Sequence, residues 1–269
     1  MPKRVIVTGA ASGIGASASE QMRAKGAQVV GLDLHADEDA GILACDVRDQ
    51  AAVDTAVGAA IERLGGLDVL VNNAGIGLPQ SAAAPPGDDA IAVLEVNLIG
   101  PWRVTGAAMP ALRASRGRVV NVASGLAHMA VPFAPAYCMS KRGITAYSDA
   151  LRYEVGHEVA VTTVYPGYVK TPIHDASVEA GFGLDGLVPE ESLKKVAGRV
   201  VRAALGSPVR DLATTPLGTV SYAVLRRLPR RVVDRAIMSS LRRQARTGSL
   251  DDSLLAGDFA RAIRGGKKS

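Results

Sequence analysis

A short β-branched segment runs directly into a glycine-rich turn at the beginning of the chain. Residues Arg4–Thr8 are apolar or β-branched after the first position, and Gly9, Gly13 and Gly15 follow before a helical pattern that continues to about Lys25. Such a run is typical of a buried parallel strand, and glycines between a strand and a helix let backbone N–H groups approach a pyrophosphate. The segment predicts a βαβ unit with a phosphate-binding loop, although an ordinary strand-to-helix turn also suits a chain with 29 glycines.

Further apolar runs alternate with alanine-rich helical segments along the chain. They predict strands at Gln28–Asp33, Asp68–Asn72, Gly117–Val122 and Val159–Tyr165. This alternation is typical of βαβ units and a parallel sheet, and 269 residues suffice for one such domain. The expected fold class is therefore α/β.

The composition favours an intracellular setting. The two cysteines are too few for a disulfide framework, which indicates a reducing cytoplasm. The chain has no apolar run of about 18 residues that could span a membrane, and its first strand begins at Arg4, which leaves no room for a signal peptide. We therefore expect a cytoplasmic protein. No group of His, Cys and Asp has metal-ligand spacing, so we expect no metal site.

Tyr137 and Lys141 form a candidate catalytic pair. They are four residues apart, so on a helix both side chains leave the same face, one turn apart. An ammonium group beside a phenol favours the phenolate, and a lowered tyrosine pKa makes a usable acid or base near neutral pH. Ser124 precedes Tyr137 by thirteen residues. Because a Tyr-x-x-x-Lys pair also arises by chance, its significance depends on the accompanying motifs.

Six motifs occur in an order and at separations that resemble one enzyme family. They are Thr8-Gly9-x-x-x-Gly13-Ile14-Gly15, Asn72-Asn73-Ala74-Gly75, Asn97, Ser124, Tyr137-x-x-x-Lys141 and Pro166-Gly167. Over about residues 3–206 the chain resembles the short-chain dehydrogenase/reductase family. The resemblance implies a Rossmann-like, doubly wound parallel sheet of about seven strands in a single domain, a nicotinamide cofactor, and hydride exchange between an alcohol and a carbonyl. We expect a catalytic domain at 1–216 and a basic helical extension at 217–269.

The resemblance implies a role for each of four catalytic residues. Tyr137 would exchange the proton of the alcohol, and Ser124 would hold the substrate oxygen. Lys141 would bind the nicotinamide ribose and, with the cationic ring of the oxidised cofactor, lower the pKa of Tyr137. Asn97 lies in an otherwise apolar helical pattern, where the family has a kink that connects Lys141 to solvent through water. A plain buried hydrogen-bonding asparagine is the alternative.

The cofactor-binding residues that the resemblance implies follow the predicted strands, on the edge where α/β sheets bind ligands. They are Gly9, Ser12, Gly13, Ile14, Gly15, Asp33, Asp46, Val47, Asn73, Ala74, Gly75, Tyr137, Lys141, Pro166, Gly167, Val169 and Thr171. Among these, Asn73 and Gly75 would lie near the ribose, while Val169 and Thr171 would hold the carboxamide. Asp46 would reach the adenine, or is a solvated turn residue.

The choice of cofactor depends on Asp33. It closes the second predicted strand, eighteen residues after Gly15, where a carboxylate can accept hydrogen bonds from both hydroxyls of the adenosine ribose. The same carboxylate would repel a 2′-phosphate, and three more acidic residues follow at 37–39. We therefore expect NAD(H) in preference to NADP(H), with a plain turn residue as the alternative role of Asp33.

The segments expected to border the substrate are mostly apolar. They are the residues after Ser124 and a predicted lid at about 172–195, in which Phe182 lies between two glycines. No arginine cluster there suits a carboxylate or phosphate, so we expect a hydrophobic secondary alcohol or its ketone. His128 and His174 are candidate substrate contacts or solvated loop residues. The alternative function is a catalytically silent NAD(H)-binding sensor or interaction module on the same fold.

The family resemblance also implies a homodimer or homotetramer. Its interface would be built from the helices predicted at 97–109 and 137–155. The unusual C-terminal extension counts against the tetramer and leaves the expected dimer unaffected.

The C-terminal extension is strongly basic. Residues 207–247 contain nine Arg and two Asp, a net charge of +7, which exceeds the net charge of +5 of the whole chain. The pattern predicts helices at Leu217–Leu225 and Val232–Leu241, interrupted near Pro229. Three interpretations stay open. The extension is a helical flap over the substrate cleft, or its 217–247 segment is a basic amphipathic surface that contacts anionic membrane. The third is non-specific attraction to nucleic acid, since no aromatic residues for base stacking accompany the arginines. Specific nucleic-acid binding is not expected.

Overall fold

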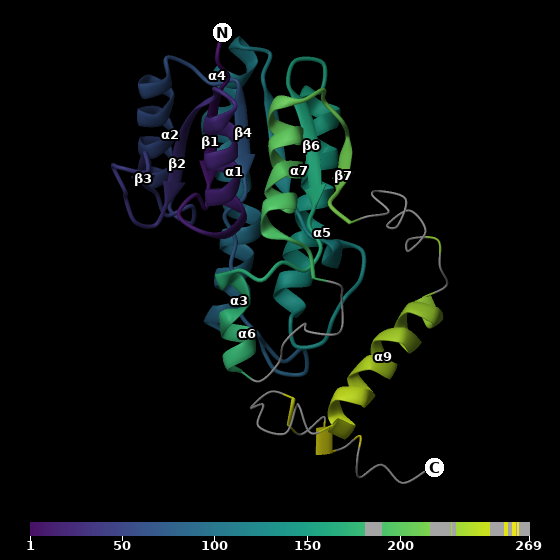
Figure 1. The fold of residues 1–269 in the computed structure, drawn as a ribbon. Helices are drawn as coiled ribbons and strands as arrows, with labels where there is room; N and C mark the ends of the chain where they lie inside the picture. Colours follow the sequence, from purple (N-terminus) through teal and green to yellow (C-terminus); the bar gives the residue numbers. More distant parts are fainter. Residues whose placement is uncertain are drawn as a thin grey trace.

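The computed structural model describes residues 1–180, 190–215 and 230–247, with isolated positions at 227, 256–257, 260–261 and 263. Within these residues, seven strands form one sheet in the order β3-β2-β1-β4-β5-β6-β7, and all neighbouring strands are parallel (Figure 1). The strands are β1 Arg4–Thr8, β2 Gln28–Asp33, β3 Ile42–Ala44, β4 Val69–Asn72, β5 Arg118–Val122, β6 Ala160–Tyr165 and β7 Asp211–Ala213. The order reverses between β1 and β4, which confirms the doubly wound, Rossmann-like fold.

Helices cover both faces of this sheet. The α-helices are α1 Gly13–Ala24, α2 Gln50–Leu64, α3 Asp88–Leu94, α4 Gly100–Ala114, α5 Pro135–Val155, α6 Asp175–Glu179, α7 Leu193–Leu205 and α9 Arg230–Thr247. Short turns of other types are the π-helix η1 Glu95–Ile99 and the 3₁₀-helices η2 Gly125–Ala127 and η3 Pro172–His174. Helices α1 and α7 pack on one face of the sheet, while α2, α4 and α5 cover the other.

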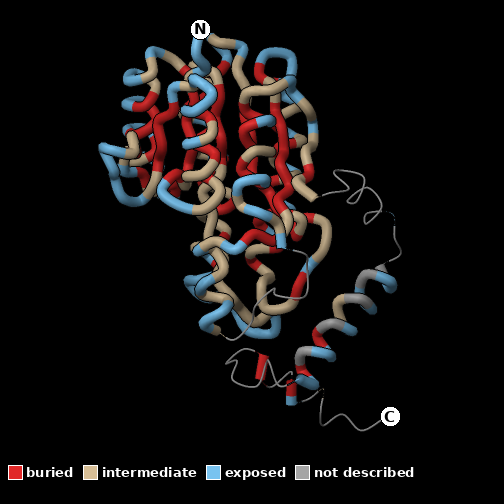
Figure 2. The backbone as a smooth tube through the Cα atoms, viewed as in Figure 1, coloured by how far each residue is buried: buried red, intermediate tan, exposed pale blue. Residues whose placement is uncertain are grey.

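The central strands are buried on both sides, as a parallel sheet requires. In β1, Val5 and Val7 join the core beneath α1 and α7, while Ile6 joins the core beneath α2 and α4. All three side chains are fully buried, and Figure 2 shows buried residues running along the strands between exposed helix surfaces. Because both faces of the strand are buried, its sequence is a continuous apolar run.

The predicted strand positions are confirmed closely. Residues Arg4–Thr8 and Gln28–Asp33 form β1 and β2 with the expected bounds, and three later strands begin one residue after the predicted start. In the tail, the helix predicted at Val232–Leu241 is part of the longer α9. The helix predicted at Leu217–Leu225, the break near Pro229 and Phe182 of the predicted lid lie outside the described residues.

A row of buried polar side chains crosses the sheet from α4 to α5. The Nδ2 of Asn72 donates to Thr105 Oγ1 at 2.9 Å and to Asn121 Oδ1 at 2.8 Å. Asn121 Nδ2 then donates to Ser148 Oγ at 2.8 Å. All four residues are buried, so the row supplies hydrogen-bond partners within the core, while Ser148 Oγ also donates to the carbonyl of Ile144 at 2.7 Å.

Replacing Asn121 by Ala should destabilise the fold markedly. The substitution leaves one buried N–H of Asn72 without its acceptor, and an unsatisfied buried group costs about 1–3 kcal/mol. We expect the free energy of unfolding, measured in urea, to fall by about 2–3 kcal/mol. Ser148→Ala is the control, because Asn121 then keeps Asn72 as a partner and the loss should be smaller. Equal stability of Asn121→Ala and the natural chain would contradict this role for the row.

The C-terminal helix α9 is set off from the sheet and its helices (Figure 1). Its Leu241 and Ala245 are fully buried against Ala256 and Ala260. Phe133, from the loop after η2, packs against the same cluster. This cluster therefore connects α9 to the loop that precedes α5. No helix in the described residues is long and apolar enough to cross a membrane.

Candidate active site

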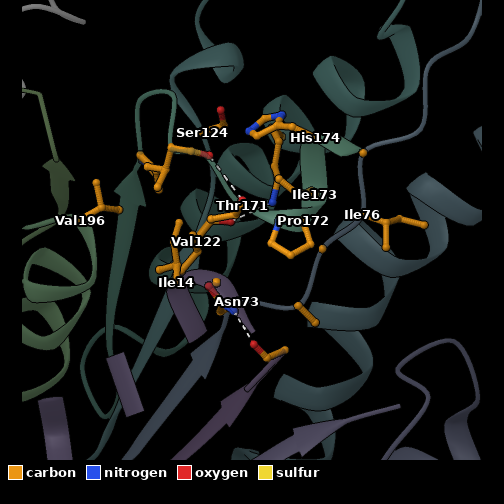
Figure 3. A pocket seen from close by; sticks show the side chains of 18 of the residues that line it. Ile14, Asn73, Ile76, Val122, Ser124, Thr171, Pro172, Ile173, His174 and Val196 are labelled. Atoms are coloured by element: carbon orange, nitrogen blue, oxygen red, sulfur yellow. Dashed lines mark hydrogen bonds between the residues drawn. The ribbon is translucent and has the colours of Figure 1, made fainter. Parts of the chain in front are cut away.

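A cavity of about 1620 Å³ lies at the carboxyl edge of the sheet. It contains almost every residue predicted from the sequence for the cofactor or for catalysis; the exceptions are Gly15 and Asn97. In Figure 3, Ile14 and Asn73 lie at one end of the cavity, and Ser124, Ile173 and His174 lie at the other. The site thus has a glycine-loop end and an end bordered by the segments that follow β5 and β6.

The turn between β1 and α1 has the geometry of an anion-binding loop. Gly9 and Gly13 have positive φ angles of 65° and 53°, which favour glycine. Gly15 packs so closely on the backbone of Gly9 that a Cβ would overlap it. Ser12 is the N-cap of α1, but its side chain makes no capping hydrogen bond. The first-turn N–H groups of α1 therefore stay available to an anion at the positive end of the helix.

Thr8 and Asn73 hold this loop against the end of β4. Thr8 Oγ1 accepts hydrogen bonds from the backbone N–H groups of Asn73 and Ala74, both at 3.0 Å. The Asn73 side-chain amide donates to the carbonyls of Thr8 and Gly9, each at 3.1 Å. Asn73 lines the cavity, but its side-chain N–H groups are already used to fix the loop. Thr8 begins the glycine motif in the sequence, but its role in holding the loop was not predicted.

Asp33 stands beside the glycine loop at the end of β2. Its carboxylate accepts hydrogen bonds from the backbone N–H of Ala11 and from that of Leu34, both at 2.8 Å. These bonds orient the carboxylate at the cavity wall. Each carboxylate oxygen keeps acceptor capacity beyond its one backbone bond, so Asp33 can accept further hydrogen bonds from a ligand.

Arg48 enters the same wall and was not identified from the sequence. Its guanidinium is paired with Asp46 at 2.7 Å, and this hydrogen-bonded contact holds the pKa of the Asp46 carboxyl below its usual value. Both residues line the cavity together with Val47. The pair follows β3, whose Ala44 lies opposite Asp33 in the sheet, and the Asp46 carboxylate compensates the charge of the arginine.

Ser124, Tyr137 and Lys141 meet at the other end of the cavity. Ser124 follows β5 in an extended conformation, and its Oγ accepts a hydrogen bond from Leu126 N–H at 3.2 Å. Tyr137 and Lys141 lie one turn apart on α5, as predicted, with Lys141 Nζ 5.6 Å from the centroid of the Tyr137 ring. Lys141 Nζ donates to the carbonyl of Val122 at 3.1 Å. The three side chains therefore border one space.

Burial controls the protonation of Tyr137 and Lys141. Burial raises the pKa of Tyr137 to about 12, and a hydrogen bond with Ser124 opposes this only in part. Burial also lowers the pKa of Lys141 to about 8. The expectation that Lys141 and the oxidised cofactor together lower the tyrosine pKa stays a prediction, since desolvation is the main influence among the protein's own residues. At neutral pH the Tyr137 side chain is a phenol that can donate a proton.

Asn97 lies behind this cluster and outside the cavity wall. It is buried on the π-helix η1, so the predicted irregularity of the helix at this position is confirmed. Its side chain bonds the backbone N–H and C=O of Ile76 at 2.8 and 2.9 Å, and also Ser140 Oγ at 3.2 Å. At Gly75, a Cβ would lie 3.2 Å from Asn97 Oδ1 and 3.5 Å from Lys141 Nζ. A narrow space beside Gly75 therefore separates Asn97 from Lys141.

The segment after β6 crosses the cavity above the glycine loop. Thr171 lies over Gly13, since a Cβ at Gly13 would be 3.4 Å from Thr171 Cγ2. The N–H of Gly167 is shared between Glu191 Oε2 and Thr214 Oγ1, each at 3.1 Å. Glu191 and Thr214 also line the cavity. They were missed in the sequence because they reach Gly167 from segments 24 and 47 residues away.

The end of the cavity near Tyr137 is largely apolar. Its wall includes Leu126, Met129, Val131, Ala134, Ile173 and Val178. His174 lines it as well, with its ring 4.9 Å from that of Tyr168. His128 is not part of the wall and instead packs its ring 4.8 Å from Tyr165. Among the described residues, no group of three or more His, Cys, Asp or Glu side chains could hold a metal ion.

Comparisons with known proteins agree with this architecture. The family model for short chain dehydrogenases matches residues 3–180. The chain is 35% identical to trans-4-hydroxycyclohexanecarboxylate dehydrogenase of Sinomonas cyclohexanicum, over 67% of this chain and 77% of the relative. It is 36% identical to human 17-beta-hydroxysteroid dehydrogenase type 6, over 63% of this chain and 57% of the relative.

A solved structure of a related enzyme has the same fold. Ligand-free aldohexose dehydrogenase of Thermoplasma acidophilum superposes with a TM-score of 0.68 and 25% identity, covering 76% of this chain and 87% of that one. The matched family model and the relatives place the chain among oxidoreductases that typically use a nicotinamide dinucleotide. The protein belongs to the short-chain dehydrogenase family.

Proposed function

We propose that the protein is an NAD(H)-dependent oxidoreductase that interconverts a hydrophobic secondary alcohol and its ketone. The observation that carries the proposal is the meeting of Ser124, Tyr137 and Lys141 at the apolar end of a cavity whose other end holds the glycine loop and Asp33. One ligand can therefore extend from Asp33 to Lys141 while a second, apolar ligand contacts Ser124 and Tyr137. This is the arrangement that hydride exchange between a cofactor and a substrate needs.

The residues present fit a nicotinamide dinucleotide. The uncapped N-terminus of α1 suits a pyrophosphate, and the Asp33 carboxylate suits the two hydroxyls of an adenosine ribose. Lys141 can bind the hydroxyls of the other ribose, and the backbone of Val169 with Thr171 can hold the carboxamide. Bound there, the cofactor supplies or accepts the hydride.

Tyr137 is the proposed acid and base. As a phenol with a pKa of about 12, it can protonate the alkoxide that develops when a ketone is reduced. In the oxidative direction it must first lose its proton, which requires positive charge close to the ring. Ser124 would hydrogen-bond the substrate oxygen and keep it against Tyr137. A protonated Tyr137 is the form that the reduction of a ketone needs at this position.

Lys141 and Asn97 are the proposed route for the proton behind Tyr137. Lys141 has a pKa of about 8, so it can release and take up a proton near neutral pH. Asn97 fixes the carbonyl of Ile76 across the space beside Gly75. A water held there could pass a proton between Lys141 and solvent. The relay would restore the protonation state of Tyr137 after each turnover.

Replacing Asp33 by Ala should change the cofactor preference. Hydrogen bonds to a charged group contribute about 1.5–3 kcal/mol, so kcat/KM with NAD⁺ should fall about 10- to 100-fold. Use of NADP⁺ should improve because the carboxylate no longer repels the 2′-phosphate. Steady-state kinetics with both cofactors measure the ratio.

Asp39→Asn is the matched control for the Asp33 variant. It removes an exposed negative charge from the loop that follows β2 without touching the cavity wall. Its cofactor ratio should match that of the natural chain. A natural chain that already prefers NADP⁺ would refute the assignment of Asp33, while the proposed chemistry at Tyr137 would still stand.

The substrate proposal follows from the apolar wall and from the relatives. The described residues that border Ser124 and Tyr137 are mostly aliphatic, and two relatives are named for a hydroxycyclohexane carboxylate and for a hydroxysteroid. Both names denote a secondary alcohol on a saturated ring. We infer that this chain also accepts an alicyclic or steroid-like alcohol or ketone.

The direct test follows absorbance of reduced nicotinamide while purified protein is mixed with NAD⁺ and a panel of alicyclic alcohols, or with NADH and the ketones. Turnover that depends on Tyr137 supports the proposal. The rival function, a silent NAD(H)-binding sensor, predicts that NADH binds by calorimetry while every alcohol and ketone stays unchanged. Measuring binding and turnover on the same preparation separates the two.

We also propose that two or four copies associate through α4 and α5. Trp102 on α4 is 60% exposed and stacks on Tyr147 of α5. Tyr153 on α5 is 76% exposed. Large exposed aromatic side chains on neighbouring helices favour a protein contact. Light scattering of the natural chain and of Trp102→Glu would test this, since a charge at the contact should shift the mass toward the monomer.

A further inference from the structure

Helix α9 presents a row of arginines to solvent. Arg231, Arg235, Arg242 and Arg246 are all exposed. At about 100° per residue, their positions fall within about 60° of one another around the helix axis. With a rise of about 1.5 Å per residue, the row is about 22 Å long. These four residues are called the arginine row.

The apolar side of α9 is already covered. Leu241 and Ala245 are fully buried among Ala256 and Ala260, and Ile237 packs against the same cluster. Helix α9 therefore does not need to turn its arginine side toward the protein to bury apolar surface. The arginine row is the part of the helix that stays available to a partner.

The arginine row has no carboxylate partner within the described part of the chain. Some arginines on other helices and strands are paired, as in Arg4–Asp68, Arg103–Glu95 and Arg152–Asp149. In α9 the sequence contains a single acidic residue, Asp234. Unpaired guanidinium groups at this density repel one another, so an anionic partner would relieve the repulsion.

We propose that the arginine row docks α9 on a bilayer surface rich in anionic phospholipid. A straight row of guanidinium groups on one side of a helix matches a plane of lipid phosphates, and the helix would lie along that plane. The rest of the chain outside residues 207–247 is net negative, so the excess positive charge of the chain lies in the stretch that contains this helix. α9 contains no aromatic residue that could stack on a nucleic-acid base, and this favours lipid over nucleic acid.

Docking through α9 would hold one border of the active-site cavity near the membrane. Phe133 packs against the buried cluster of α9, and its neighbours Val131 and Ala134 line the cavity. A lipophilic substrate dissolved in the bilayer would then be concentrated beside this border. This second step depends on the proposed function, whereas docking itself does not.

The test measures flotation of the full-length protein with vesicles and uses no catalysis. Vesicles of phosphatidylcholine alone are compared with vesicles that also contain phosphatidylserine, at low and at high salt. We expect binding only to the anionic vesicles, and release at high salt because the attraction is screened. Neutralising the arginine row should lower the partition coefficient about a hundredfold or more. That variant combines Arg231→Gln, Arg235→Gln, Arg242→Gln and Arg246→Gln.

A matched control removes the same charge from the opposite edge of the sheet. It combines Lys3→Gln, Lys25→Gln, Arg63→Gln and Arg116→Gln, all at exposed positions near the amino ends of the strands. The control should float like the natural chain. A third variant with lysine at all four positions of the arginine row should also float, since lysine keeps the positive charge. It separates the loss of charge from any effect of the substitutions on the helix.

Three results would overturn the proposal. They are the failure of the natural chain to float with anionic vesicles at low salt, an equal loss in the control variant, and strong binding to duplex DNA without binding to vesicles. Turnover of a water-soluble ketone by each variant is measured separately. Loss of flotation with normal turnover would show that docking and catalysis are independent, whereas normal flotation without turnover would count against the proposed function alone.

Discussion

Tyr137→Phe should lower kcat for ketone reduction by about a thousandfold while leaving NADH binding intact. The substitution removes one oxygen from a partly buried ring on α5 and leaves the ring in the same apolar surroundings. General acid–base catalysis contributes about 10²–10⁴ to enzymatic rates, and Tyr137 is the proposed group that supplies the proton. The loss should appear in kcat rather than in KM, because the phenol acts mainly as the alkoxide develops.

The measurement combines turnover at saturating substrate with calorimetric binding of NADH. Tyr153→Phe is the matched control, because it removes a hydroxyl from the same helix at a position that is 76% exposed. It should retain full activity. Tyr137→Phe with more than about a tenth of the natural kcat would contradict the role of the phenol as the acid. Loss of NADH binding would instead indicate that Tyr137 serves the cofactor.

The fold was predictable because each strand, turn and helix is marked by the residues of its own segment. Strands β1 and β2 are buried on both faces, so each is read as an uninterrupted apolar run with clear ends. The glycine loop requires positive φ at Gly9 and Gly13, which marks it in the sequence. The pairing of Tyr137 and Lys141 follows from helical periodicity alone.

The parts of the site that were missed depend on contacts between distant segments. Glu191 and Thr214 meet at the N–H of Gly167 from two different parts of the chain, and no local pattern marks such a meeting. Arg48 was overlooked because only the fold brings the turn after β3 beside Asp33. Spacing also shows that a lysine is near Tyr137, but not how strongly desolvation raises the pKa of the phenol and lowers the pKa of the lysine.

Lys141→Met should make the protein more stable and nearly inactive. Lys141 is 4% exposed, and burial lowers its pKa from 10.5 to about 8. The folded protein therefore binds this proton more weakly than the unfolded chain does. At pH values below 8 the charged side chain costs about 3 kcal/mol of the free energy of unfolding. Methionine has a similar length, carries no charge and suits an apolar site.

The pH dependence of this gain gives it a distinctive signature. Between about pH 8 and pH 10.5 the unfolded chain holds more protons on Lys141 than the folded protein does, so the stability of the natural chain rises with pH in this window. The advantage of Lys141→Met should thus be largest at neutral pH and should disappear as pH approaches 10.5. At neutral pH we expect its Tm to be higher by several degrees.

Activity should change in the opposite direction. Without Lys141 the proposed relay and the proposed contact with the nicotinamide ribose are both lost, so kcat/KM should fall by about a hundredfold or more. Thermal unfolding at neutral and alkaline pH, with Lys25→Met as an exposed control, measures the stability part. A lower Tm for Lys141→Met at neutral pH, or a difference that does not vary with pH, would contradict it. A buried lysine that costs stability yet is needed for turnover is expected where a site is built for chemistry rather than for folding.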